Sequence, residues 1–272
     1  MKGLTILFIL MSVIGMFFIT GCNQEDVLAP EEFAPPTNLK ALSKDGEVTI
    51  YWTAAPAATA DFFAGYRIMT RQGSVLVDSV LVGKTATNHT VQTLINGQTY
   101  TFSIRSVKDN GDVSTEVTLQ WGPTRRFLTA ARIYEFESTN PSGLQFSTAS
   151  VFSFSSASPD NRSLIDFWID GRTNSTPLLK SPHDQTISTG WRTTQFIETA
   201  VSDMNTQVDV PLISSFRSTP GLTITASKVY FARTADGNYA RFQVSAVQGS
   251  YPNRYVDVTI AYNSGTGAWA KK

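Results

Sequence analysis

The sequence predicts an all-β protein, in which a β-sandwich is followed by a second antiparallel β-rich domain. From residue 37 onward, short runs of alternating apolar and polar residues recur between glycine-containing turns, which is the pattern of half-buried strands. After Trp121-Gly122-Pro123 the composition shifts toward serine, threonine and aromatic residues. The region that follows is long enough for a core of its own, so we predict domains at residues 37–124 and 125–272.

An apolar segment precedes both domains. From Lys2 the next charged residue is Glu25, and Leu, Ile, Phe, Met and Val dominate the residues between them. A charged start followed by an apolar stretch predicts an export signal. The stretch approaches the roughly 18–20 residues that cross a bilayer, so an uncleaved transmembrane helix is the alternative interpretation.

Cys22, the single cysteine of the chain, ends this segment. The motif Ile19-Thr20-Gly21-Cys22 resembles the bacterial lipobox. The resemblance implies a signal peptide over residues 1–21, cleavage before Cys22, and acylation of Cys22 with a diacylglycerol and usually a further acyl chain such as palmitate. Several acyl chains anchor a protein far more firmly than one. An acylated Cys22 leaves no thiol for a disulfide, a nucleophile or a metal site.

Residues 22–36 are acidic and proline-containing, which predicts a flexible tether behind the lipid. The pair Glu25-Asp26 resembles the export signals of surface lipoproteins in the Bacteroidetes group, and a solvated acidic linker is the alternative. We therefore expect a lipid-anchored protein of the cell envelope, on the outer membrane and surface-exposed if the acidic pair acts as a signal. The chain has 22 basic and 22 acidic residues, and this balance argues against a nucleic-acid partner.

The first domain carries a specific motif. Alternating runs at residues 47–52, 65–71, 74–83 and 99–107 predict strands, and the turns at Gly46 and Gly111 supply positive φ angles. "LINGQTY", ending at Tyr100, resembles the tyrosine corner of the fibronectin type III family, with Trp52 and Tyr66 at two of that family's core positions. The departure is Asn96-Gly97 in place of the usual Pro-Gly, and Asn tolerates that turn. Such domains space, present and bind, and the fold by itself implies no catalysis.

In the second domain, "KVYFARTADGNYARFQVSAV" places Asp236-Gly237 between two alternating runs, which predicts a β-hairpin. Further strands are expected at residues 131–138, 143–148, 150–156, 164–171, 191–198 and 254–262, with weak helical content only at residues 198–206. "LIDFWIDG", the hairpin and "RYVDVTIAYN" resemble the HmuY-like surface lipoproteins. That resemblance implies a hand-like β fold that captures haem and delivers it to an outer-membrane transporter.

Haem in that family is held by axial side chains such as a histidine pair, but this domain has one histidine, His183. Met204 is a candidate second ligand because a thioether can coordinate haem iron. A loop histidine beside Pro182 and Asp184 is equally explained as a surface residue. His89 in the first domain is expected to be an ordinary strand residue.

The residues favour a binding protein over an enzyme. Two histidines, no G-x-S-x-G elbow and no zinc-ligand cluster leave little basis for catalysis. The paired carboxylates would suit a glycosidase in principle. Glu135 and Glu137 are instead interpreted as a solvated edge, and Asp166 and Asp170 as the polar ends of a buried strand.

Exposed aromatics would support binding, because they stack on sugar rings or a porphyrin, although aromatics also build β cores. We name His183, Trp191 and Trp269 as candidate ligand-binding residues. The predicted function is non-catalytic binding or adhesion to a protein or glycan partner, with no metal and no required cofactor, and haem capture is the alternative.

The lipobox interpretation is testable at Cys22. The chain expressed in a bacterium that acylates lipoproteins should incorporate labelled palmitate, and Cys22→Ser should abolish the incorporation because no other thiol exists. A Cys22→Ser chain that still carried the label would refute the lipobox interpretation.

Overall fold

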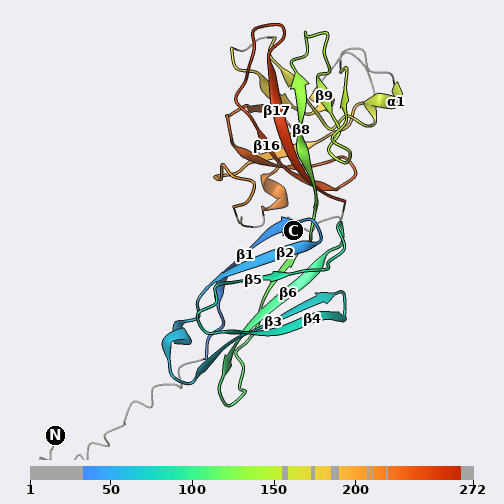
Figure 1. Cartoon of the computed structure of the whole chain (residues 1–272). Helices are drawn as coiled ribbons and strands as arrows, with labels where there is room; N and C mark the ends of the chain where they lie inside the picture. Colours follow the sequence, from blue (N-terminus) through green and yellow to red (C-terminus); the bar gives the residue numbers. More distant parts are fainter. Residues whose placement is uncertain are drawn as a thin grey trace, which may run out of the picture. The chain divides into compact units, whose positions relative to one another are not determined.

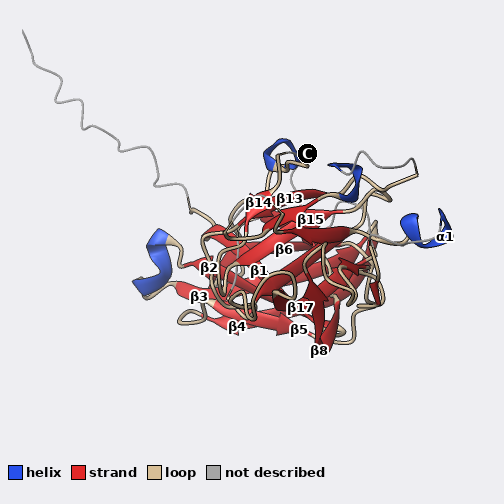
Figure 2. Ribbon diagram, turned by 90° about the horizontal axis from the view of Figure 1, so that it is seen from above, coloured by secondary structure: helices blue, strands red, loops and turns tan. Residues whose placement is uncertain are grey.

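The computed structural model describes residues 33–154, 159–172, 175–184, 190–206, 209, 211–218 and 220–264, with the backbone alone at 126–129 and 159–160. Cys22, the apolar segment and Trp269 lie outside the described residues. Phe33–Lys272 form one compact unit. Strands dominate it and the helices are single turns (Figure 2). None of the helices in the described part of the chain is long and apolar enough to span a bilayer. The predicted all-β class is confirmed.

Strands β1–β7 form two antiparallel sheets with the orders β1-β2-β5 and β4-β3-β6-β7 (Figure 1). The predicted strands of this region are all present, and one single-turn helix, η1 (Pro56–Thr59), follows β2. The strands are β1 (Thr37–Lys44), β2 (Glu47–Thr53), β3 (Phe63–Gln72), β4 (Val75–Gly83), β5 (Asn88–Val91), β6 (Tyr100–Lys108) and β7 (Val117–Trp121).

The tyrosine corner expected at Tyr100 is present. The buried Tyr100 hydroxyl accepts a hydrogen bond from the Ile95 backbone N–H at 3.0 Å. Trp52 and Tyr66 lie in the core with their rings edge to face, 5.5 Å between centroids. The Tyr66 hydroxyl accepts the Ala55 N–H at 3.0 Å. Each buried tyrosine therefore satisfies its polar tip locally while its ring fills the sandwich.

The substitution of Asn96 for the usual proline does more than tolerate the turn. The Asn96 side-chain oxygen accepts the Gly46 N–H at 3.0 Å, and its amide nitrogen donates to Asp45. Gly46 and Gly97 have φ angles of 68° and 80°, which glycine adopts without steric cost. Asn96 therefore ties the β1–β2 turn to the tyrosine corner, a link that proline cannot make because it has no side-chain polar group.

The remaining strands form two five-stranded sheets with the orders β10-β9-β11-β12-β14 and β13-β15-β16-β17-β8. In the second of these sheets β8, β16 and β17 run side by side (Figure 1). The strands are β8 (Arg125–Tyr134), β9 (Gly143–Leu144), β10 (Val151–Phe152), β11 (Phe167–Asp170), β12 (Leu178–Lys180), β13 (Gln195–Glu198), β14 (Leu222–Thr223), β15 (Val229–Arg233), β16 (Tyr239–Val244) and β17 (Tyr255–Asn263). Single helical turns occur at α1 (Pro159–Arg162), η2 (Pro182–Asp184) and η3 (Ile213–Ser215).

The predicted hairpin joins β15 and β16. Thr234 and Asn238 close it through a backbone hydrogen bond of 2.9 Å, and Gly237 takes a φ of 77°. Buried side chains from both five-stranded sheets, including Phe167 and Phe242, form one apolar cluster. The rings of this pair lie 5.4 Å apart. This half of the chain therefore has its own two-sheet core.

The helical content expected at residues 198–206 is wrong, since this segment forms bends and turns. The Thr199 hydroxyl donates to the Val229 carbonyl at 2.7 Å, and the Asp203 carboxylate accepts the Asn205 N–H at 2.9 Å. Short polar side chains that bond to nearby or neighbouring backbone compete with helix formation.

Between β7 and β8 the chain passes from the first two sheets to the two five-stranded sheets, and this junction is buried and hydrogen-bonded. The Trp121 indole N–H donates to the Ser43 hydroxyl at 2.7 Å, and that hydroxyl donates to the Gly122 carbonyl at 2.6 Å. Thr124, fully buried, donates its N–H to the Lys44 carbonyl at 3.1 Å. The junction is therefore packed against the first two sheets, which limits bending there.

Gly122 offers a test of this packing. A Cβ at Gly122 would lie 2.2 Å from the Gln98 carbonyl oxygen, whereas a Cβ at Gly83 would meet nothing within 4 Å. We expect Gly122→Ala to lower the free energy of unfolding by about 1–3 kcal/mol through overpacking. Gly83→Ala, measured in the same denaturation series, should stay within about 0.5 kcal/mol of the parent chain. Equal stability of the two variants would contradict the close junction.

Candidate functional site

The candidate site lies on the side of β11 that faces away from the main core. Successive side chains of a strand point to opposite faces. Phe167 and Ile169 enter the main core, while Trp168 belongs to a separate buried cluster with Phe154 and Ile165. By the same alternation, Asp166 and Asp170 share the face of Trp168.

A layer of aromatic rings covers this outer face. Phe154 stacks on Trp168 with 4.7 Å between centroids and 9° between planes, and Trp191 lies 4.3 Å from Phe154. Trp168 is fully buried and donates its indole N–H to the Ser181 carbonyl, but Trp191 is half-buried. The Arg162 guanidinium lies 5.4 Å from the Trp191 ring. Phe136 and Phe152 are likewise partly buried against this cluster, so Trp191 is one of three rings through which solvent reaches the aromatic layer.

Arg192 fixes the position of Trp191. Its guanidinium donates to the buried Asp166 carboxylate at 3.0 Å, to the Ser163 carbonyl at 2.9 Å, and to Asp236 in the β15–β16 turn. Charge-assisted hydrogen bonds to several partners hold a side chain in one geometry. The residue next to Trp191 is thus anchored at three points.

Burial raises the pKa of Asp166 to about 6, against the opposing effects of Arg192 and of the Phe146 N–H that the carboxylate accepts at 2.8 Å. Because the folded-state pKa lies above the ordinary value, the stability contributed by this group is fully present below about pH 4. It is lost as the pH rises through 6.

Asp170, at the other end of β11, behaves in the opposite way. Burial alone would raise its pKa, but hydrogen bonds from Arg172 and Lys180 outweigh burial and lower the pKa to about 2. Arg172 donates at 2.8 and 2.9 Å, and the Lys180 ammonium lies at 3.0 Å. Asp170 therefore stays ionised and contributes stability that is lost only as the pH falls toward 2.

Two of the predicted ligand-binding residues, His183 and Trp191, lie on adjacent segments. His183, exposed in η2, donates its backbone N–H to the Arg192 carbonyl at 3.0 Å. Both carboxylate oxygens of Asp184 are buried and have no hydrogen-bond partner within the described residues. Burial raises the pKa of Asp184, while the charges of Lys180 and His183 lower it. The sequence missed Asp184, because its unpaired state depends on how η2 packs. We call His183, Asp184 and Trp191 the Trp191 surface.

The solvated-edge interpretation is wrong for Glu135. Its side chain is fully buried, and both oxygens accept hydrogen bonds from Arg254, at 3.0 and 2.7 Å. Glu137 is exposed, as expected. The error arose because Arg254 lies 119 residues away in the sequence, so no local pattern pairs it with Glu135.

Three of the four carboxylates that would suit a glycosidase are engaged in ion pairs of this kind. Glu135, Asp166 and Asp170 each meet an arginine within 3.0 Å. Asp166 and Asp170 are four residues apart along an extended segment, or about 13 Å, beyond the roughly 5–9.5 Å at which paired carboxylates hydrolyse glycosides. They serve the structure of the sheet.

The described residues contain no group of three or more His, Cys, Asp or Glu side chains that could hold a metal ion. Met204 is buried in an apolar cluster with Val229 and Phe231, whereas His183 is exposed. His89 lies half-buried in β5, opposite Ile50 of β2.

Comparison with known protein families identifies the type of the first domain. Residues 34–120 match the family described as fibronectin type III domain. These residues are a fibronectin type III domain. Domains of this type serve binding or scaffold roles, and no enzyme family is indicated for the chain. No curated protein shows a significant match to the chain, and the HmuY-like resemblance of the second half stays a prediction.

Similar solved structures include the solution structure of a fibronectin type III domain of human collagen alpha-1(XX), which is 20% identical, covers 34% of this chain and 87% of that chain, and has a TM-score of 0.29. A Fn3-like protein from Clostridium thermocellum is 22% identical, covers 34% of this chain and 96% of that chain, and has a TM-score of 0.25.

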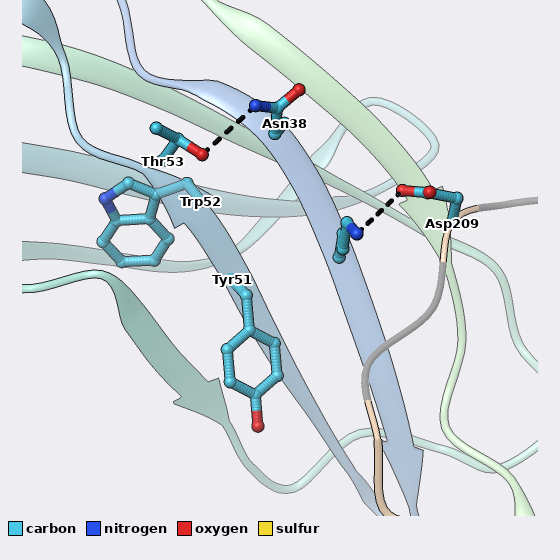
Figure 3. Close-up of a pocket in the computed structure, with 6 residues that line it drawn as sticks. Asn38, Tyr51, Trp52, Thr53 and Asp209 are labelled. Carbon is cyan, nitrogen blue, oxygen red and sulfur yellow. Dashed lines mark hydrogen bonds and ion pairs between the residues drawn. The ribbon is translucent and has the colours of Figure 1, made fainter. Parts of the chain in front are cut away.

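A pocket of about 470 Å³ is lined mostly by residues of the fibronectin domain (Figure 3). Its lining residues are Asn38, Lys40, Tyr51, Trp52, Thr53 and Asp209. The Asn38 amide donates to the Thr53 hydroxyl at 3.2 Å, and Lys40 pairs with Asp209 at 3.6 Å. These four polar groups pair with one another, and the buried indole N–H of Trp52 has no hydrogen-bond partner within the described residues. At the Trp191 surface the buried, unpaired group is a carboxylate, which is costlier to leave without a partner than a neutral N–H. We therefore favour the Trp191 surface as the ligand site.

The structural role of the buried pairs predicts a large effect at Glu135. Glu135→Gln keeps the side-chain shape but leaves the Arg254 charge without its counter-ion, and we expect a loss of about 3 kcal/mol in the free energy of unfolding. Asp257→Asn, which removes the exposed pair with Arg132, should cost less than about 1 kcal/mol. Similar losses in both variants, measured by chemical denaturation, would contradict the structural assignment of Glu135.

Proposed function

We propose that the protein is a lipid-anchored, non-catalytic binding protein of the cell envelope, and that it binds a glycan at the Trp191 surface. The observation that carries the proposal is the buried, unpaired carboxylate of Asp184 beside the exposed His183 and close in the fold to the half-buried Trp191. Unpaired buried polar groups are costly, and a ligand that pairs them recovers that cost.

The chemistry of these groups favours a sugar. An aromatic ring offers an apolar face with a fixed orientation, which suits the C–H face of a pyranose. A carboxylate only accepts hydrogen bonds and has several lone pairs, so it can receive two neighbouring hydroxyl groups. Apolar contact with a few convergent polar groups is the general composition of ligand sites.

The positions of the other candidates also bear on the choice of ligand. Met204 packs inside an apolar cluster, so it is not presented with His183 to a porphyrin, and we propose no haem site. The packed junction at Gly122 and Thr124 supports the idea that the fibronectin domain acts as a stiff spacer between the lipid anchor and the glycan-binding half.

The proposal is tested with the full chain in detergent on an array of bacterial and host polysaccharides, followed by titration calorimetry with the glycan retained. Trp191→Ala and Asp184→Asn should each weaken binding about 10-fold or more, as expected for one stacking contact or one charge-assisted hydrogen bond. Tyr251→Ala is the matched control, because Tyr251 is exposed and lies outside the Trp191 surface.

Asp184→Asn separates a binding role from a structural one. If the carboxylate is kept for a ligand, its replacement by a neutral amide should raise the melting temperature of the free protein while weakening glycan binding. No retained glycan, or binding unchanged in Trp191→Ala and Asp184→Asn, would refute glycan binding at this surface. Retention of a protein instead of a glycan would identify the other class of partner.

A further inference from the structure

The loop between β2 and β3 is apolar although it lies at the surface. Residues 54–62 read Ala-Ala-Pro-Ala-Ala-Thr-Ala-Asp-Phe, with Asp61 as the one charged residue. Turns and loops are usually rich in glycine, asparagine, aspartate and serine, whose polar groups serve the backbone or meet water. Phe62 is 50% exposed. The loop therefore presents an aromatic ring and little polar surface to its surroundings.

Phe62 belongs to a small aromatic group. The Phe33 ring lies 6.2 Å from the Phe62 ring and 6.0 Å from the buried Phe63 ring. The Lys108 ammonium lies 4.9 Å from the Phe33 centroid and 5.7 Å from the Phe62 centroid, within the range of a cation–π interaction. The Phe62 carbonyl accepts the Asp109 N–H at 2.9 Å. We call the end of the fibronectin domain formed by these residues the Phe62 end.

The Phe62 end lies away from the junction with the second half. The β2–β3 loop follows the last residue of β2, whereas the β1–β2 turn precedes its first residue. The junction packs at that turn, since Thr124 donates its N–H to the Lys44 carbonyl. β2 has seven residues and spans about 20 Å. The junction therefore leaves the Phe62 end uncovered.

The chain enters the fibronectin domain at the Phe62 end, because Phe33 is the first described residue. The ten residues 23–32 separate it from Cys22, and they span at most about 40 Å when fully extended. With Cys22 acylated, the Phe62 end is held within this distance of the bilayer. A tether this short gives an effective concentration in the millimolar range, so a contact too weak to recruit a free protein is still formed.

We propose that the Phe62 end rests on the zwitterionic headgroup surface of the bilayer that holds the acyl chains of Cys22, with the Phe62 ring inserted between headgroups and hydrocarbon. Aromatic and apolar side chains of peripheral proteins bury at this boundary. Asp61 and Asp109 are exposed beside the ring and outnumber the ammonium of Lys108. Anionic headgroups would repel these carboxylates, which favours a lipid without net charge.

This inference rests on the lipid anchoring in the proposed function and adds an orientation to it. Docking at the Phe62 end turns the junction at Thr124 away from the bilayer, because the two lie at opposite ends of β2. A tether alone leaves the orientation of the domain free. The contact therefore distinguishes a domain that stands on the membrane from one that only hangs on a linker.

A fluorescent label near Phe62 tests the contact. Thr59→Cys places a thiol at an exposed position of η1, and this thiol is the only free one once Cys22 is acylated. The full chain, acylated in a bacterium, is labelled there and reconstituted into phosphatidylcholine vesicles that contain a quencher at the headgroup boundary. We expect strong quenching. A label at Ser74→Cys, exposed in the β3–β4 turn at the far end of β3, should show little.

Substitution of Phe62 in the chain labelled at residue 59 tests the ring itself. Phe62→Ser should lower the ratio of docked to undocked protein about 4- to 12-fold, as expected for half of the transfer free energy of this side chain. Phe62→Leu keeps an apolar side chain and should retain most of the quenching. Ile95→Ser is the matched control, because Ile95 is 63% exposed and lies at the tyrosine corner, and it should leave the quenching unchanged.

Flotation with the vesicles separates this inference from the proposed function. A chain that does not float with the vesicles lacks the anchor, which refutes the anchoring and the contact together. A chain that floats but is quenched equally at residues 59 and 74, or equally in Phe62→Ser and the parent, keeps its anchor and overturns docking of the Phe62 end.

The lipid composition tests the chemistry of the partner. Addition of phosphatidylglycerol should weaken the quenching at residue 59, and stronger quenching would overturn the zwitterionic surface. Shielding of the label that rises with the number of proteins per vesicle but does not respond to the lipid quencher would identify a second copy as the occupant, and would overturn the proposal.

Discussion

The second half of the molecule depends on one constraint: a carboxylate removed from water must meet a cation or a set of donors. Three carboxylates on or beside β11 are buried, namely Glu135, Asp166 and Asp170. Each forms an ion pair with an arginine, and the three arginines, Arg254, Arg192 and Arg172, lie in different segments of the chain. The short-stranded sheet has few backbone hydrogen bonds of its own, so these pairs define where its surrounding loops lie.

The same constraint sets the geometry of the Trp191 surface. Arg192 is held by Asp166 and Asp236, and its backbone carbonyl accepts the His183 N–H. Trp191 is therefore oriented from one side by an ion pair and from the other by its contact with Phe154. Asp184 is the exception to the rule, since its carboxylate has no hydrogen-bond partner in the described part of the chain. A ligand site needs both a rigid support and a group that is left unsatisfied, and the two occur here within a few residues.

Local sequence patterns predicted much of the fibronectin half. Alternation located its strands, and Tyr100 marked the corner, because a strand and a corner are encoded by residues close together in the chain. The hairpin at Gly237 was predictable for the same reason. Asn96 was expected only to fit its turn, since its bond to Gly46 crosses 50 residues of sequence.

The second half was less predictable because its decisive contacts are long-range. Glu135 was assigned to a solvated edge although Arg254 neutralises it within the sheet. The prediction of helical content at residues 198–206 did not include the hydrogen bond from the Thr199 hydroxyl to the Val229 carbonyl. His183 and Trp191 were identified by residue type, but their proximity follows from a backbone hydrogen bond that no motif encodes.

Asp184 departs from the pairing that the other buried carboxylates follow. Both of its carboxylate oxygens are buried without a hydrogen-bond partner in the described part of the chain, although buried polar groups are usually paired. Tyr66 and Tyr100 bond their hydroxyls, and the buried carboxylates of the short-stranded sheet meet arginines. The other unpaired groups include neutral ones, such as the Trp52 indole N–H and the hydroxyls of Thr70 and Thr194, which cost less to bury than a carboxylate. Departures from local consistency carry a stability cost and are expected at functional sites. The hydroxyl groups of a glycan would satisfy the Asp184 carboxylate, so this departure points to the chemistry of what binds there.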